Sequence, residues 1–288
     1  MKKPIFTGAC TALVTPFLKE KINTPMLRQL IRRQLNAGID ALVICGTTGE
    51  SAALSDAEKL ELFRVSRDTI PENVAFLAGT GSNDTAHAVA LSQAAEDCGA
   101  DALLVVSPYY NKGTEDGLYR HYASIADSVH IPLILYNVPG RTGLDMPVSL
   151  YRKLSELPNV LGVKEAGTDI RKIAKIRQVC PPDFFVWCGN DDLAVPAMAL
   201  GALGVISVIS NVEPELTRAM VRAALDGDFD TAADLQLRLY PLIEALFLEV
   251  NPAPVKAAME FIGYDCGDCR LPVGKVSEAA RARLQALL

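Results

Sequence analysis

The sequence lacks the basic surface that a nucleic-acid-binding protein needs. Its 28 Lys and Arg residues are outnumbered by 34 Asp and Glu residues, which gives a formal net charge of -6. No basic cluster interleaved with aromatic residues occurs anywhere along the chain. Binding to the phosphate backbone depends on such a cluster. We therefore expect no nucleic-acid partner, and small molecules are the expected ligands.

A secreted disulfide framework is also missing. The seven cysteines are odd in number and are scattered from Cys10 to Cys269, a pattern that fits a reducing cytoplasm better. Cys266 and Cys269 form a single C-x-x-C, but no second pair accompanies them and the three histidines have no ligand spacing to it. A lone C-x-x-C is a weak signal for zinc or redox chemistry, so we predict no metal site.

The chain shows neither a convincing targeting signal nor a membrane-spanning segment. Lys2 and Lys3 precede the apolar stretch Ile5–Val14, but polar residues and a glycine interrupt it and no A-x-A follows, so a first strand is the plainer interpretation. The segment Leu193–Val212 is uncharged, yet a proline, two glycines and an asparagine break it up. It is predicted to be a buried helix followed by a strand, and we expect no membrane partner.

What the sequence has in abundance is a repeated pattern of short apolar runs separated by segments of helical period. Half of the 288 residues are hydrophobic, which suits one large domain with a sizeable core. The runs show little polar alternation, as expected of parallel strands covered on both faces. Eight such runs lie between residue 8 and about residue 225: Ala9–Thr15, Ala41–Cys45, Val74–Ala78, Ala102–Ser107, Leu133–Asn137, Val160–Lys164, Phe184–Cys188 and Val205–Val208.

The segments between these runs carry helix signals. Thr24 and Pro25 open one helix that Gly38 closes, and Ser55 with Glu58 forms a capping box for the next. Eight strands, each followed by a helix, predict an α/β fold of the (β/α)₈ TIM-barrel type over residues 1–225. A doubly wound open sheet is the competing architecture, but no G-x-G-x-x-G follows the first strand and no Walker lysine occurs.

Strand signals stop after the Asp-Gly-Asp at residues 226–228. Three helical stretches follow, near Thr231–Val250, Pro254–Ile262 and Ser277–Leu288. We therefore expect a small helical C-terminal domain over residues 226–288 that packs on the barrel.

Lys164 is the most informative residue at a strand end. Active sites of such barrels lie at the C-terminal ends of the strands, and Lys164 follows the apolar run Val160–Val163. A lysine on a buried strand must be paired or shifted toward its neutral amine, which is a nucleophile toward ketones. Neighbouring Glu165 points to the opposite side of the strand and is a poor ion-pair partner. The alternative is a structural lysine bridged to a distant carboxylate.

Polar residues at other strand ends support a site at the same face. Tyr136 ends the preceding strand and could serve as a proton donor and acceptor beside Lys164, although a core tyrosine with a satisfied hydroxyl is the alternative. Thr47 and Thr48 follow the second strand, where they could relay protons and bind a carboxylate or simply form a turn. The case for a site depends on these features meeting at one face.

Five motifs together make the sequence resemble the pyruvate-dependent aldolase family, which includes dihydrodipicolinate synthases, N-acetylneuraminate lyases and keto-deoxy-sugar-acid aldolases. The resemblance extends almost from end to end. The motifs are G-T-T-G-E-S at Gly46–Ser51, S-P-Y-Y-N at Ser107–Asn111, Y-N-V-P-G-R-T-G at Tyr136–Gly143, G-V-K-E at Gly162–Glu165 and G-V-I-S-V at Gly204–Val208.

The resemblance implies Schiff-base chemistry without a metal or organic cofactor. Lys164 would condense with pyruvate, Tyr136 would act as acid and base, Thr47 would relay protons, and Tyr110 would complete the relay from a neighbouring subunit of a homotetramer. Pyruvate's carboxylate would be held by Thr48 and by the backbone near Ile206. These residue roles come from the family and not from the spacing.

Within the family, Arg141 resembles the dihydrodipicolinate synthase branch, which joins pyruvate to aspartate semialdehyde in lysine and diaminopimelate biosynthesis. A guanidinium can bind the carboxylate of the semialdehyde bidentately, whereas a surface arginine after a Pro-Gly turn is the structural alternative. A sialic-acid or keto-deoxy-sugar-acid lyase with the same lysine is the second hypothesis. A barrel that senses a small ligand without turning it over is the third.

The resemblance also implies an effector pocket for lysine at a subunit interface, and here the chain departs from the inhibited pattern. Asp56 and Lys59 stand where that pattern has histidines, and His87 stands where it has a glutamate. The added cation and the missing carboxylate predict weak or absent inhibition by L-lysine, while solvated helix residues without a regulatory role are the alternative. Four further residues match the inhibited pattern: Ser51, Ala52, Asn83 and Tyr109.

Overall fold

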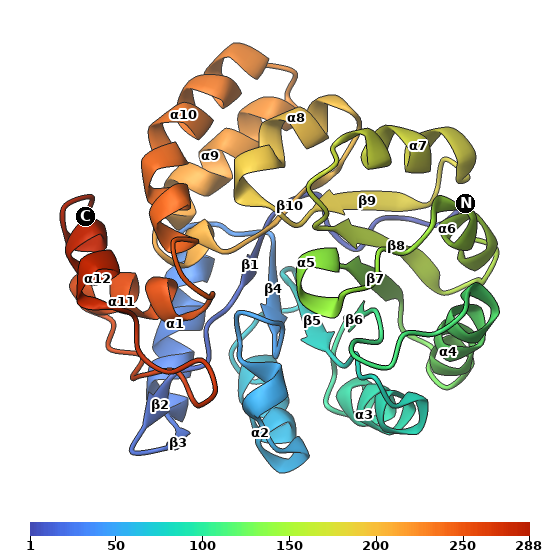
Figure 1. Cartoon of the computed structure of the whole chain (residues 1–288), viewed down its shortest axis with the longest axis horizontal. Helices are drawn as coiled ribbons and strands as arrows, with labels where there is room; N and C mark the ends of the chain where they lie inside the picture. Colours follow the sequence, from blue (N-terminus) through green and yellow to red (C-terminus); the bar gives the residue numbers. More distant parts are fainter.

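Eight parallel strands close into a barrel at the centre of the molecule (Figure 1). The computed structural model of the chain describes residues 1–288. Around the barrel the strand order is β1-β10-β9-β8-β7-β6-β5-β4, and every pairing is parallel. The predicted TIM barrel is therefore confirmed. The strands are β1 (Gly8–Ala12), β4 (Ala41–Ile44), β5 (Ala75–Gly79), β6 (Ala102–Val106), β7 (Leu133–Asn137), β8 (Val160–Glu165), β9 (Phe185–Cys188) and β10 (Gly204–Ser207).

A short antiparallel hairpin, which the sequence did not reveal, follows the first barrel strand. Strands β2 (Phe17–Leu18) and β3 (Lys21–Ile22) are joined by Lys19 and Glu20, whose φ angles are +48° and +64°. Two residues with positive φ are the geometry of a tight hairpin turn, which is usually signalled by Asn-Gly or Asp-Gly. Lys-Glu gives no such signal, so the hairpin was not predicted. The predicted first strand, Ala9–Thr15, also continues past β1, which ends at Ala12.

Helices surround the barrel and continue beyond it as a C-terminal group (Figure 1). The predicted capping box is present, with Ser55 and Glu58 bonding each other's backbone N–H groups at the start of α2. Helix α1 begins at Thr24 as expected, but Asn23 rather than Thr24 caps it. The helices are α1 (Thr24–Asn36), α2 (Asp56–Arg67), α3 (Thr85–Asp97), α4 (Glu115–Asp127), α5 (Pro139–Thr142), α6 (Val148–Leu154), α7 (Arg171–Val179), α8 (Ala194–Ala199), α9 (Pro214–Leu225), α10 (Phe229–Leu246), α11 (Ala253–Phe261) and α12 (Glu278–Gln285).

The strands bury side chains on both faces. Tyr136, Trp187 and Ile206 belong to a cluster inside the barrel, and a larger cluster fills the space between the strands and the surrounding helices. This two-sided burial explains why the strand sequences are almost continuously apolar. The C-terminal helix α10 packs on α8 and α9, and α12 packs on α10 and α11. None of the helices combines the length and the apolar character needed to cross a bilayer.

Candidate active site

Two neighbouring strand ends bring Lys164 and Tyr136 together inside the barrel. Strands β7 and β8 pair with Tyr136 opposite Lys164 and Asn137 opposite Glu165. Both side chains of the first pair are buried, and the Lys164 Nζ lies 4.4 Å from the centroid of the Tyr136 ring. Because side chains alternate along a strand, Asn137 and Glu165 face outward from the same strand ends. The two residues that the sequence analysis singled out first are therefore direct neighbours.

No carboxylate is paired with Lys164. The ion pairs of the structure include other buried lysines, Lys172 and Lys256, but not this one. The amine is therefore not tied up in the structural bridge that was considered as an alternative. Gly189, just after β9, provides the room beside it, because a methyl group there would lie 3.0 Å from the Lys164 Cε and 2.6 Å from the Ala166 Cβ.

A fully buried carboxylate that the sequence analysis missed lies at the next two strand ends. The Asp191 Oδ2 accepts hydrogen bonds of 2.9 Å from the backbone N–H groups of Val208 and Ile209. Burial raises the pKa of this carboxyl, while the Ser207 hydroxyl, the two amides and the charge of Lys164 oppose that rise. Asp191 thus fixes the turn that follows Ile206 and places a negative charge within the field of Lys164. Asp191 lies in the polar Gly-Asn-Asp-Asp segment after β9, which carries no periodic signal.

The loop after β4 supplies the two threonines. Thr48 is buried, and its Oγ1 accepts a hydrogen bond of 3.0 Å from the Asn251 side chain. The backbone carbonyl of Asn251 in turn accepts a bond of 3.1 Å from the Arg141 guanidinium. Asn251 therefore connects two residues proposed to hold carboxylates, although it lies just before the C-terminal helix α11. Sequence reasoning could not find it, because the contact joins residues that are far apart in the chain.

A cavity of about 790 Å³ opens at this end of the barrel. Its wall includes three of the predicted catalytic or binding residues, Thr47, Tyr136 and Arg141. Lys164, Thr48 and Ile206 are buried and do not line it. Tyr110 is 92% exposed and also lies outside the cavity wall. One chain thus assembles most of the predicted site, while Tyr110 projects into solvent.

The seven predicted effector residues line the same cavity. The Asp56 carboxylate accepts hydrogen bonds of 3.0 Å from the His87 Nε2 and 3.4 Å from the buried Lys59 Nζ. The bond from His87, followed by the charges of His87 and Lys59, lowers the pKa of Asp56. The carboxylate is thus held ionised by two groups of the chain itself. No group of three or more His, Cys, Asp or Glu side chains in the structure is arranged to hold a metal ion.

An unpaired, buried lysine at the end of a TIM-barrel strand, beside a tyrosine, is the arrangement that the chemistry of a class I aldolase-type lyase requires. The chain belongs to the dihydrodipicolinate synthetase family, whose sequence model matches residues 5–288. The resemblance noted in the sequence is therefore confirmed over nearly the whole chain.

Named relatives agree with this assignment. A 4-hydroxy-tetrahydrodipicolinate synthase of Acetivibrio thermocellus is 48% identical over 96% of this chain and 94% of its own. A chloride-inhibited dihydrodipicolinate synthase of Acinetobacter baumannii, solved in complex with pyruvate, is 38% identical, with a TM-score of 0.95 over 98% of this chain and 97% of that one. The enzyme of Cyanidioschyzon merolae, solved with lysine bound, is 36% identical, with a TM-score of 0.96 over 99% of this chain and 98% of that one.

Proposed function

We propose that the chain joins pyruvate to L-aspartate 4-semialdehyde and forms 4-hydroxy-tetrahydrodipicolinate in lysine and diaminopimelate biosynthesis. The observation that carries this proposal is the buried, unpaired Lys164 beside the Tyr136 ring. Full-length relatives that are named for this reaction support it.

The proposed reaction begins with the attack of the Lys164 amine on a ketone. Lys164 adds to the C2 carbonyl of pyruvate and water leaves, which forms an imine. Loss of a methyl proton to Tyr136 gives an enamine, because the protonated imine accepts the electron pair. The enamine carbon then attacks the aldehyde carbon of the second substrate. Finally the substrate's own amino group replaces Lys164 at C2, which closes the ring and frees the enzyme.

The carboxylates of the two substrates need separate partners. Thr48 and the backbone near Ile206 are the proposed partners of pyruvate, and the turn fixed by Asp191 supports the second of these. Arg141 is the proposed partner of the semialdehyde carboxylate, and its position on the cavity wall supports this role. A guanidinium matches a carboxylate with two parallel N–H donors.

Tyr110 is proposed to act on the site of a neighbouring subunit in a homotetramer. Its exposed ring and its φ of +71°, which is uncommon for a non-glycine residue, support a side chain directed away from its own barrel. The seven unbonded cysteines support a location in the reducing cytoplasm.

Borohydride trapping tests the proposed chemistry. Incubation with pyruvate followed by borohydride should add one reduced pyruvate to the intact mass, and peptide mapping should place it on Lys164. Lys164→Arg keeps the charge but cannot form the imine, so it should show no adduct, whereas Lys175→Arg, on the exposed side of α7, is a control that should be labelled normally. An adduct on another lysine would overturn the assignment.

A sialic-acid or keto-deoxy-sugar-acid lyase remains the second candidate, because it would use the same lysine and tyrosine. A coupled assay with pyruvate and aspartate semialdehyde, run beside a cleavage assay with the sugar acids, separates the two. Condensation with the semialdehyde and no sugar-acid cleavage is the expected result. A barrel that only senses its ligand would bind pyruvate without gaining covalent mass.

A further inference from the structure

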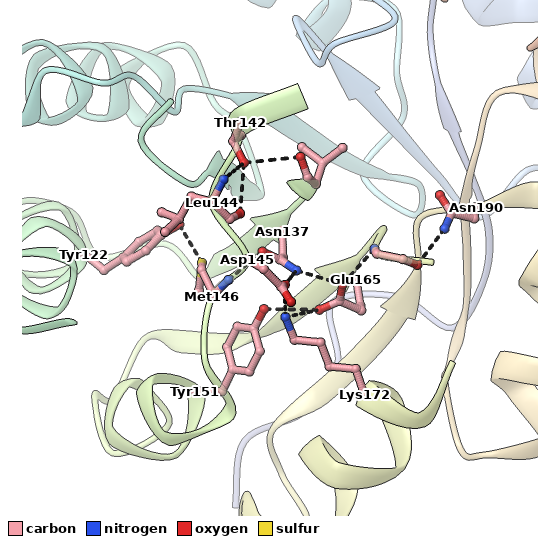
Figure 2. Close-up of polar contacts among 12 residues, drawn as sticks. Tyr122, Asn137, Thr142, Leu144, Asp145, Met146, Tyr151, Glu165, Lys172 and Asn190 are labelled. Atoms are coloured by element: carbon pink, nitrogen blue, oxygen red, sulfur yellow. Dashed lines mark hydrogen bonds and ion pairs between the residues drawn. The ribbon is translucent and has the colours of Figure 1, made fainter. Parts of the chain in front are cut away.

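A buried hydrogen-bonded network lies on the outer face of the barrel wall, at the strand ends that carry Tyr136 and Lys164. Asn137 and Glu165 follow these residues directly, are opposite each other in the β7–β8 pairing, and are buried on the outer side of the barrel wall. The Asn137 Nδ2 donates a hydrogen bond of 2.8 Å to the Glu165 Oε1. Figure 2 shows this contact at the centre of a set of polar side chains from the two strands and the adjacent helices.

Asn137 uses both of its N–H donors and its amide oxygen in this network. Its amide nitrogen donates to Glu165 and also, at 2.9 Å, to the Asp145 Oδ1, while its amide oxygen accepts from the backbone N–H of Met146 at 3.1 Å. An amide with two donors and one acceptor in use is held in a single orientation. Because Asp145 and Met146 follow the turn that carries Arg141, the same side chain fixes the far end of that turn (Figure 2).

Glu165 is equally constrained from its own side. Its Oε1 also accepts from the Gly167 backbone N–H at 2.8 Å, and its Oε2 accepts from the Tyr151 hydroxyl at 3.1 Å. Lys172 hydrogen-bonds Asp145 and lies 3.8 Å from the Glu165 Oε2. Burial raises the pKa of Glu165, and Lys172 with these donors opposes the rise. The groups that contact the Glu165 carboxylate are therefore hydrogen-bond donors or a cation, and all of them favour its ionised, accepting form.

We infer that Asn137 and Glu165 form a positioning pair that holds Tyr136 and Lys164 in register for proton transfer and imine formation. The pair joins the two strands one residue beyond the reacting side chains, on the opposite face of the sheet. A rotation or slip of either strand end would break the Asn137–Glu165 bond, and it would also change the 4.4 Å separation of the amine and the ring. This role rests on the proposed function.

Asn137→Leu tests the pair, because leucine keeps the branched shape of the amide but offers no donor or acceptor. Reactive groups displaced by about 1 Å lose on the order of 10²-fold in rate, so we expect kcat to fall about 10- to 100-fold. The KM for pyruvate should change much less, because Thr48 and the turn after β10 make no hydrogen bond to Asn137. Borohydride trapping of Lys164 should slow in the same proportion.

Asn159→Leu is the matched control. Asn159 precedes the other end of β8, where its amide donates to the backbone carbonyls of Ala126 at 2.8 Å and Val129 at 3.1 Å. The same substitution at the other end of the β7–β8 pair should lower the melting temperature while kcat remains within about twofold of the wild type, because the reacting groups lie at the opposite end. An equal loss of kcat in both variants would overturn the proposal.

Substitutions of Glu165 test the other member of the positioning pair. Glu165→Gln keeps an oxygen that can accept from Asn137 and should retain most of kcat, whereas Glu165→Met removes the acceptor and should lose as much as Asn137→Leu. The double variant Asn137→Leu/Glu165→Met should be no slower than the slower single variant, because two partners of one interaction are not additive. Fully multiplicative losses would contradict the pair.

Two outcomes separate this proposal from the proposed function. A wild-type protein that neither traps pyruvate nor condenses it would refute the function and with it the positioning role. A wild-type protein that turns over, together with a folded Asn137→Leu variant of unchanged kcat, would refute the positioning role alone. If Asn137→Leu does not fold, Asn137→Ser, which removes the amide and keeps a small polar group, is measured against the same criteria.

Discussion

At the scale of single residues, the hydroxyl of Tyr136 is the group whose removal is most informative. Tyr136→Phe keeps the ring beneath the Lys164 Nζ and therefore keeps the packing inside the barrel. Because a positioned acid or base contributes about 10²–10⁴-fold, we expect kcat to fall by that order while the melting temperature stays nearly unchanged. Steady-state kinetics and thermal unfolding check this. Near-normal activity in the folded variant would rule out the proton relay.

Arg141→Ala should produce a different pattern. The guanidinium lies on the cavity wall and contacts the carbonyl of Asn251, away from the Lys164 amine. We expect kcat/KM for the semialdehyde to fall, because the proposed partner of its carboxylate is lost, while pyruvate still traps Lys164. Trapping experiments and initial rates with each substrate varied give the two readings. Loss of trapping would assign Arg141 to pyruvate instead.

The site residues differ in how far the sequence alone could predict them. Lys164 and Tyr136 could be found because a polar residue that ends an apolar run is unusual, and the parallel barrel then brings strand ends together. Asn251 and Asp191 could not be found in this way. Asn251 reaches Thr48 from a segment 203 positions later in the chain, and Asp191 bonds backbone N–H groups, which leave no mark on the sequence.

At the scale of elements, the strands were predictable and their short irregular connections were not. The prediction of β7 has the observed bounds, and those of the other strands differ at their ends. For β1, β4 and β10 the apolar run continues beyond the last residue of the strand, whereas β5 and β8 extend past the apolar run to Gly79 and Glu165. Helix α5 was not predicted, because its four residues are too few to show a helical period. The β2–β3 hairpin lacked the usual turn residues.

A buried ion pair joins the C-terminal helix α11 to the loop after β4. The Lys256 Nζ of α11 lies 2.8 Å from the Glu50 Oε1, and both side chains are at most 3% exposed. The Glu50 Oε2 also accepts from the Arg270 backbone N–H at 2.8 Å. Glu50 adopts a φ of +56°, a left-handed conformation that a glutamate avoids unless its surroundings hold it there. The pair therefore fixes the loop that carries Thr47 and Thr48.

Lys256→Met should expose the contribution of this pair. Removing one partner leaves an uncompensated buried charge, which costs about 3–5 kcal/mol in the free energy of unfolding. The double variant Glu50→Gln/Lys256→Met should regain part of that loss, because no charge is then left unpaired. Chemical denaturation of both variants checks the expectation. A single variant as stable as the wild type, or a double variant less stable than the single one, would contradict it.

At the scale of the whole molecule, three of the proposed catalytic and substrate-binding residues share one cavity with the proposed effector residues. Arg141, Thr47 and Tyr136 lie on its wall together with Asp56, Lys59 and His87. The wall extends from α2 and α3 to the turn at α5 and to the segment Arg270–Val273, which lies between α11 and α12. A ligand in one part of this cavity would therefore change the electrostatic potential and the water content of the other part. The charges of the proposed effector pocket decide which ligands can bind there.

Those charges predict that L-lysine inhibits this enzyme weakly or not at all. Lysine is a cation at its side chain and at its α-amino group, and binding it requires a carboxylate that is free to pair. The two carboxylates in this part of the cavity wall, Asp56 and Asp84, are already engaged. Asp56 accepts hydrogen bonds from His87 and Lys59, and Asp84 accepts from the backbone N–H groups at the start of α3. The buried Lys59 adds a positive charge that repels a cationic ligand.

Initial rates across a lysine titration test this prediction, with both substrates held near their KM values. We expect rates that stay flat where a sensitive relative would be fully inhibited. The variant Lys59→His/His87→Glu removes the fixed cation and supplies a carboxylate, so it should gain sensitivity, whereas Lys175→His on the exposed part of α7 is a control that should not. Strong, saturable inhibition of the wild type at sub-millimolar lysine would show that Asp56 binds the ligand in spite of its two partners, and that the charge argument is wrong.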